Sequence, residues 1–156
     1  MENVKEQLQV FTRRFGLLNA SCCEECCGEQ VSLVQSHILY EIRRTGTSSI
    51  QQVADELGMD ITTFSRQVKT LEGRGLILRQ VSPGDRRVSL LGLTVEGGRV
   101  LDQIDRYMAN KLEQIFSFLT TFERETVVRS LGLLNEAVAK AGCCCTPVDE
   151  KLACCK

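Results

Sequence analysis

The chain has 156 residues, of which 43% are apolar and 25% are charged, and its formal net charge is −1. This length and balance are typical of a soluble globular domain with a sizeable core. No apolar run approaches the roughly 18 residues of a membrane span, and MENVKEQLQVFTRRF lacks the continuous apolar segment of a signal peptide, so we expect a cytoplasmic protein without a membrane partner.

Two helices are predicted in the first part of the chain. The first has apolar residues at alternating steps of four and three, which place them on one helical stripe: Val4, Leu8, Phe11, Phe15 and Leu18. The second is expected over residues 31–44, with Val34, Ile38 and Ile42 facing inward. His37, the single histidine, is expected to be partly buried beside them. The following TGTSS is predicted to be a loop.

The next segment, SIQQVADELGMDITTFSRQVKTLEGRGLI, predicts a helix-turn-helix. Ser49 and Gln52 form a capping-box pattern, Gly58 ends the first helix, and Asp60 can cap the second. The expected buried residues of the two helices are Ile50, Val53, Ala54, Leu57, Ile61, Phe64, Val68 and Leu71. The outward face of the second helix carries groups suited to base edges and phosphates: Thr62, Thr63, Ser65, Arg66, Gln67, Lys69 and Thr70.

A change of period after Gly75 predicts a β-hairpin. LILRQVS and RVSLLGL are strand-like runs around the turn sequence PGDRR, which places Arg86 and Arg87 at the tip. Residues 61–90 contain six Lys or Arg against two acids, a net charge of about +4 in a chain of −1. Helix, turn, helix and basic hairpin in this order indicate binding to DNA.

The remaining sequence predicts two long helices with apolar stripes. The first stripe is Leu101, Ile104, Met108, Leu112, Ile115 and Leu119, and the second, which follows a capping box of Thr120 and Glu123, is Val127, Leu131, Leu134 and Val138. Little other chain is left to cover these stripes. We therefore expect a homodimer built from the first and the last two helices, which matches a two-fold DNA site. Burial of the stripes within one monomer is the alternative.

The segment VADELGMDITTFSRQVKTLEGRGLILRQVSPGDRRVSLLGLTVEG resembles the MarR family of bacterial winged helix-turn-helix regulators. The run LEGRGLILR, the motif DRR, and LT followed by Gly97 are especially characteristic, and the likeness extends over about residues 4–141. It implies a mainly α fold with a small β-hairpin wing, and a homodimer held by the first and last two helices. It also implies that the second helix of the helix-turn-helix enters the major groove.

The resemblance also implies roles for the wing and for the parts of the chain. It places the wing at the minor groove, with Asp85 positioning Arg87. Residues 1–142 form the winged-helix domain, with a DNA-reading head at about 46–93 and dimerisation helices at 1–45 and 94–142. Residues 143–156 form a cysteine-rich tail. Family members usually repress genes and release DNA when a ligand or an oxidant acts. For a dimer of this kind we expect a pseudo-palindromic operator in double-stranded DNA.

All nine cysteines lie outside the middle of the chain, in two groups: Cys22, Cys23, Cys26 and Cys27, then Cys143, Cys144, Cys145, Cys154 and Cys155. An odd number of thiols in a cytoplasmic protein does not fit a closed disulfide framework. Clusters of this kind are not part of the family resemblance. They predict an effector different from the phenolic or lipophilic compounds that many members sense.

Thiolates select soft ions, so we expect the clusters to bind a thiophilic metal or metalloid that releases the DNA. The vicinal pairs in CCEECC favour As(III), and Sb(III), Cd, Zn or Hg are further candidates. A thiol redox sensor is the alternative, although two cysteines would suffice for it. An iron–sulfur cluster, a structural zinc site and a metal-storage protein fit less well. No catalytic or phosphate-binding motif is present, so an enzyme is not predicted.

Overall fold

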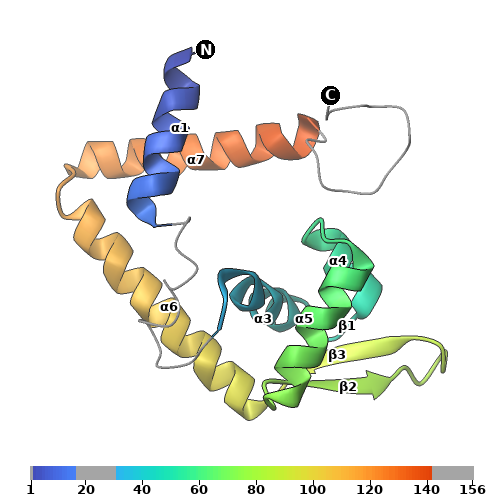
Figure 1. Cartoon of the computed structure of the whole chain (residues 1–156). Helices are drawn as coiled ribbons and strands as arrows, with labels where there is room; N and C mark the ends of the chain where they lie inside the picture. Colours follow the sequence, from blue (N-terminus) through green and yellow to red (C-terminus); the bar gives the residue numbers. More distant parts are fainter. Residues whose placement is uncertain (1, 17–30, 142–156) are drawn as a thin grey trace.

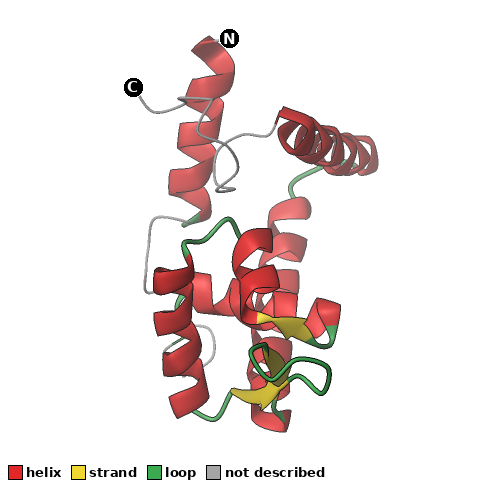
Figure 2. Cartoon of the chain, turned by 90° about the vertical axis from the view of Figure 1, so that its right-hand side faces the viewer, coloured by secondary structure: helices red, strands yellow, loops and turns green. Residues whose placement is uncertain are grey.

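The computed structural model describes residues 2–16 and 31–141. Its elements in chain order are α1 (Glu2–Phe15), α3 (Leu33–Thr45), β1 (Ser48–Ser49), α4 (Ile50–Glu56), α5 (Ile61–Gly73), β2 (Ile77–Val81), β3 (Ser89–Leu93), α6 (Val95–Phe116) and α7 (Thr121–Ala141). Helices α3, α4 and α5 lie with the sheet in one compact head, and α6 leads away from it to α7 (Figures 1 and 2). The mainly α fold with a small β-hairpin is therefore confirmed. None of the described helices is long and apolar enough to cross a membrane.

The sheet is antiparallel, with the strand order β1-β3-β2. Strands β2 and β3 form the predicted hairpin, with Ile77 opposite Leu93 and Val81 opposite Ser89. The short strand β1 comes from the segment TGTSS, which was wrongly predicted to be a loop. Ser48 pairs with Leu91 and Ser49 with Leu90, so the residues just before α4 also form the third strand.

One hydrophobic core holds the head together. Its fully buried side chains include Ile38, Leu39, Phe64, Leu71 and Leu91, and Val100 and Leu101 of α6 close it on one side. All of its residues lie between Val31 and Ile104. The predicted inward positions of α4 and α5 are confirmed except for Ile61, the first residue of α5, which is 41% exposed.

Three predictions for the flanking helices are wrong. Val34 is 42% exposed, because the buried face of α3 is formed instead by Gln35, Ile38, Leu39 and Ile42. His37 lies on the exposed face of α3 rather than beside the core. The first helix does not run on to Leu18: it ends at Phe15, since Gly16 has a φ of +87°, which interrupts helical geometry. Leu18 itself lies outside the described residues.

A tight joint fixes the wing to α6. The carbonyl oxygen of Leu76, next to β2, accepts a hydrogen bond from the backbone N–H of Thr94 at 3.1 Å. The hydroxyl of Thr94 donates to the carbonyl oxygens of Gly75, at 2.7 Å, and of Leu76, at 3.0 Å. Thr94 Oγ1 also caps α6 by accepting from the N–H of Gly97. Gly97 packs so closely that an added Cβ would lie 1.9 Å from the oxygen of Leu76. Thr94 and Gly97 of the sequence motif therefore form one structural unit with Leu76.

Candidate DNA interface

The predicted helix-turn-helix is formed by α4 and α5, with the expected caps. Ser49 and Gln52 make a reciprocal capping box at the start of α4, and Gly58 follows that helix with a φ of +60°. Asp60 caps α5 by accepting from the N–H groups of Thr62 and Thr63 at 2.8 and 3.1 Å. Hydrogen bonds from the hydroxyl of Thr63, and then from these two N–H groups, lower the pKa of Asp60. A carboxylate is thus fixed at the first turn of α5.

The outward face of α5 is divided into exposed and partly buried positions. Thr62, Thr63, Arg66, Lys69 and Thr70 are exposed, whereas Ser65 and Gln67 are partly buried at the two edges of this face. Two of the hydroxyl protons are already used: Thr63 Oγ1 donates to Asp60 at 2.7 Å, and Thr70 Oγ1 donates to the carbonyl of Arg66 at 3.1 Å. These two threonines therefore offer acceptor oxygens to a ligand.

Gln67 is held from behind by a side chain of α3. Its Oε1 accepts a hydrogen bond from Nε2 of Gln35 at 3.0 Å, and Gln35 is only 8% exposed. Gln35 was not predicted to take part in the interface. The pattern Ser32-x-x-Gln35 could have shown it to be a capping-box residue, but its contact with a helix 32 positions later has no local signature.

The wing turn is organised by Asp85. Its Oδ1 accepts from the backbone N–H of Arg87 at 2.9 Å, and its carbonyl accepts from the N–H of Val88 at 3.0 Å. The predicted contact between Asp85 and Arg87 is thus made through the backbone of Arg87. The guanidinium groups of Arg86 and Arg87 are exposed, and among the described residues neither makes an ion pair. Both are available to an anionic partner.

Positive charge gathers on α5 and the wing. Within the described chain, Arg66 and Lys69 of α5 have no ion-pair partner, as is the case for the two wing arginines. Arg79 of β2, in contrast, lies 3.6 Å from the carboxylate of Glu72, which offsets part of its charge. A basic helix face next to a basic hairpin tip forms an electrostatic footprint suited to a phosphate backbone.

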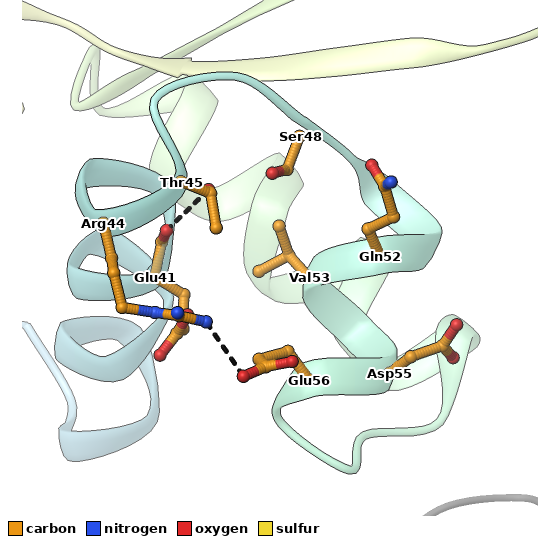
Figure 3. Close-up of a pocket in the computed structure, with 8 residues that line it drawn as sticks. All are labelled: Glu41, Arg44, Thr45, Ser48, Gln52, Val53, Asp55 and Glu56. Carbon is orange, nitrogen blue, oxygen red and sulfur yellow. Dashed lines mark hydrogen bonds and ion pairs between the residues drawn. The ribbon is translucent and has the colours of Figure 1, made fainter.

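A cavity of about 420 Å³ lies beside α4 and has the opposite charge (Figure 3). Its lining includes the carboxylates of Glu41, Asp55 and Glu56 and one guanidinium, that of Arg44. Arg44 lies 2.8 Å from each of Glu41 and Glu56, so it joins α3 to α4. The three carboxylates outnumber the single guanidinium, so the cavity would repel a phosphate group.

The nine cysteines that were predicted as metal ligands lie outside the described residues. Within residues 2–16 and 31–141, no group of three or more His, Cys, Asp or Glu side chains is arranged to hold a metal ion.

Comparisons with known proteins agree with this architecture. A family model described as MarR family matches residues 31–89. The uncharacterized HTH-type transcriptional regulator YxaD of Bacillus subtilis is 30% identical over 139 residues, which cover 88% of this chain and 94% of YxaD. The HTH-type transcriptional repressor NicR of Pseudomonas putida is 26% identical over 119 residues, which cover 76% of this chain and 75% of NicR.

Solved structures share the fold. FabT of Streptococcus pneumoniae, determined in complex with DNA, superimposes with a TM-score of 0.79 at 21% sequence identity, covering 90% of this chain and 98% of FabT. A probable transcriptional regulator from Pseudomonas aeruginosa has a TM-score of 0.66 at 25% identity, covering 84% of this chain and 98% of the other.

Proposed function

The chain belongs to the MarR family of DNA-binding transcriptional regulators, and we propose that it is a homodimeric repressor released from its operator by a thiophilic ion. The observation that carries the DNA-binding part is the pairing of two basic surfaces on one rigid head: the outward face of α5 and the tip of the wing. FabT was solved in complex with DNA, which supports DNA binding, and NicR is a transcriptional repressor, which supports repression.

Exposed apolar side chains on α1 and α7 support the homodimer. Within the described structure α7 has no buried residue, and Leu131, Leu134 and Val138 are 45 to 50% exposed. On α1, Val4, Leu8 and Phe11 are 49 to 61% exposed. Burying one such side chain is worth about 1.5–3 kcal/mol, so a second copy that covers both helices would gain a large apolar term.

The proposed complex follows from two-fold symmetry. Each protomer inserts α5 into the major groove, where Arg66 and Lys69 contact phosphates and Thr62, Thr63, Ser65 and Gln67 face base edges. Arg86 and Arg87 of each wing reach the neighbouring minor groove, with Asp85 holding the turn in shape. Two identical heads related by a dyad require a pseudo-palindromic operator.

The thiol clusters support the choice of effector. Residues 22–27 lie in sequence between α1 and α3, and both of these helices are anchored to functional elements. Lys111 of α6 donates to the carbonyl of Phe15 at the end of α1 at 2.8 Å. Gln35, in the first turn of α3, contacts Gln67 of α5. An ion that gathers three or four sulfurs between these anchors would change the geometry of both, and about 1–3 kcal/mol of coupling suffices to release an operator.

As(III) is the proposed ion because it takes three thiolates, and CCEECC offers two vicinal pairs. Sb(III), Cd, Zn and Hg share the preference for sulfur. Thiol oxidation to disulfides is the second candidate function, since the same cysteines would then respond to peroxide. The two candidates differ in the chemical agent that releases DNA, which makes them separable by one assay.

The test measures release of DNA by fluorescence anisotropy, with a duplex selected by the wild-type protein from a randomised pool. We expect arsenite to release the wild type, and the variant with Ser at Cys22, Cys23, Cys26 and Cys27 to bind DNA normally but ignore arsenite. Antimonite and cadmium serve as comparison ions, and removal of residues 143–156 should have a smaller effect.

Each other outcome rejects a different part of the proposal. Release of the Ser variant at the same arsenite concentration would place the sensor outside residues 22–27. A wild type that ignores every ion but releases under peroxide, and recovers with a thiol reductant, would establish the redox function. Failure to select any DNA sequence would reject the operator-binding role itself.

A further inference from the structure

A chain of three hydrogen-bonding groups connects the start of α3 to α5. The backbone N–H of Ser32 donates to Oε1 of Gln35 at 3.2 Å. Nε2 of the same Gln35 side chain donates to Oε1 of Gln67 at 3.0 Å. Gln35, whose amide makes both contacts, is only 8% exposed, whereas Ser32 and Gln67 are partly buried. Ser32, Gln35 and Gln67 therefore form a continuous relay of hydrogen bonds from the start of α3 to α5, the helix proposed to face DNA.

The direction of every bond in this relay is set by its first member. A backbone N–H can only donate, so the atom of Gln35 that faces Ser32 must be the carbonyl oxygen. The opposite edge of that amide is then the NH₂ group, which can only donate to Gln67. Gln67 must in turn place its oxygen toward Gln35. An amide flip at either glutamine would set donor against donor or acceptor against acceptor.

We propose that Gln35 is a positioning residue that makes Gln67 present its NH₂ group, and not its oxygen, to the major groove. This inference rests on the proposed placement of α5 in that groove. Thr63 and Thr70, four residues before and three residues after Gln67, are exposed on the same edge of α5, and Gln67 itself is partly exposed between them. Its free amide end therefore lies at the border of the proposed reading face.

A fixed amide direction has a consequence for base preference. A free glutamine can pair both its oxygen and its NH₂ group with adenine, through N6 and N7. With its oxygen engaged by Gln35, Gln67 offers only donors, which suit guanine, with acceptors at N7 and O6, and thymine, with an acceptor at O4. Adenine is less favourable, because its single acceptor, N7, lies beside the N6 donor. Cytosine presents the N4 donor instead and is disfavoured. The wild type should thus prefer guanine or thymine at one position in each half-site.

The substitution Gln35→Glu should reverse this preference without disturbing the fold. Glutamate is equally suited to the capping box, so its carboxylate still accepts from Ser32. It has no donor, however, and Gln67 must then turn its NH₂ group inward and its oxygen outward. The expected result is a swap, by about tenfold in relative affinity, from guanine or thymine to cytosine or adenine at that position.

Two further variants distinguish an effect of amide direction on base preference from an effect of the stability of α3. Gln67→Glu retains an acceptor for Gln35 and presents only oxygen, so it should prefer the same bases as Gln35→Glu. Ser32→Ala removes the hydroxyl that accepts from the N–H of Gln35 at 3.2 Å but leaves the backbone N–H in place. It should weaken the cap of α3 while the base preference stays as in the wild type.

The experiment is selection of duplexes from a randomised pool by each purified full-length protein, followed by titration of single base-pair variants at one salt concentration. The inference is supported if Gln35→Glu and Gln67→Glu swap the same position and Ser32→Ala does not. It is overturned if Gln35→Glu selects the wild-type bases at every position, or if Ser32→Ala produces the same swap. A wild type that selects no DNA at all would reject the proposed function, and the inference with it.

Discussion

Substituting Gly97 by alanine should separate α6 from the base of the wing. The added Cβ would lie 1.9 Å from the oxygen and 2.9 Å from the carbon of the Leu76 carbonyl, and both of these atoms are backbone. To restore even 3.0 Å, α6 would have to shift by about 1.1 Å at a glycine that is itself buried. A side chain cannot rotate away to relieve this contact, so the backbone must move.

The expected loss in the free energy of unfolding can be worked out from the interactions that this shift would disrupt. The N–H of Thr94 would lose good geometry with the Leu76 oxygen, and its hydroxyl would lose it with the Gly75 and Leu76 oxygens that share its one proton, at about 1 kcal/mol for each donor. Overpacking strain adds about 1–3 kcal/mol, and the higher helix propensity of alanine offsets about 1 kcal/mol. We therefore expect Gly97→Ala to lower the free energy of unfolding by about 3 kcal/mol, or the Tm by about 6–12 °C.

The neighbouring glycine provides a matched control. An added Cβ at Gly98 would meet only Cδ2 of Leu93 at 3.9 Å, an ordinary van der Waals contact. Gly98→Ala should thus raise the free energy of unfolding by up to about 1 kcal/mol through helix propensity. Urea unfolding followed by circular dichroism, with all proteins at the same protomer concentration, measures both changes. Equal stability of Gly97→Ala and Gly98→Ala would refute the close approach of α6 to Leu76.

Three further outcomes are expected. Arg87→Ala should weaken specific DNA binding by about 1–3 kcal/mol in a salt-controlled titration, with an unchanged circular dichroism spectrum, and unaltered affinity would count against the wing contact. Sedimentation at micromolar concentration should give a dimer, and a stable monomer there would remove the basis for a two-fold operator. Asp60 has a lowered pKa in the folded state, so its cap stabilises α5 above the unfolded pKa near 3.8 and loses this effect as the pH falls through the folded value. Asp60→Asn should therefore reduce the loss of stability between pH 5 and pH 3 in acid unfolding curves, and an identical pH profile would argue against the cap.

Local patterns in the sequence predicted most of the head. The Ser49–Gln52 box, the glycine after α4, the Asp60 cap and the PGDRR turn all appear in the structure, because each depends on residues within about four positions. The alternation of apolar residues also identified the core positions of α4 and α5 apart from Ile61. The resemblance to the MarR family predicted how these elements are assembled into one winged helix-turn-helix.

Contacts between distant residues could not be predicted in the same way. The pairing of Ser48 with Leu91 makes a strand from two serines, which are not among the residues enriched in strands, and only the tertiary position of β3 explains it. The contact of Gln35 with Gln67 and that of Lys111 with Phe15 join residues far apart in the chain. Val34 was misassigned because the inward stripe of α3 includes the polar Gln35, which a hydrophobic pattern does not count.

Because α6 is long, a small tilt of the helix displaces one of its ends by several ångströms. It has 22 residues, so it spans about 33 Å, and its buried residues all lie in its first ten positions, from Gly97 to Ile104. Its far end, toward α7, lies within the proposed dimer interface. A tilt of about 6° over that length displaces one end by about 3.4 Å, the separation of successive nucleotides along one strand of DNA. Since the joint of Thr94, Gly97 and Leu76 holds the near end rigidly to the wing, a small rotation between protomers would move each reading helix by about one base pair out of register.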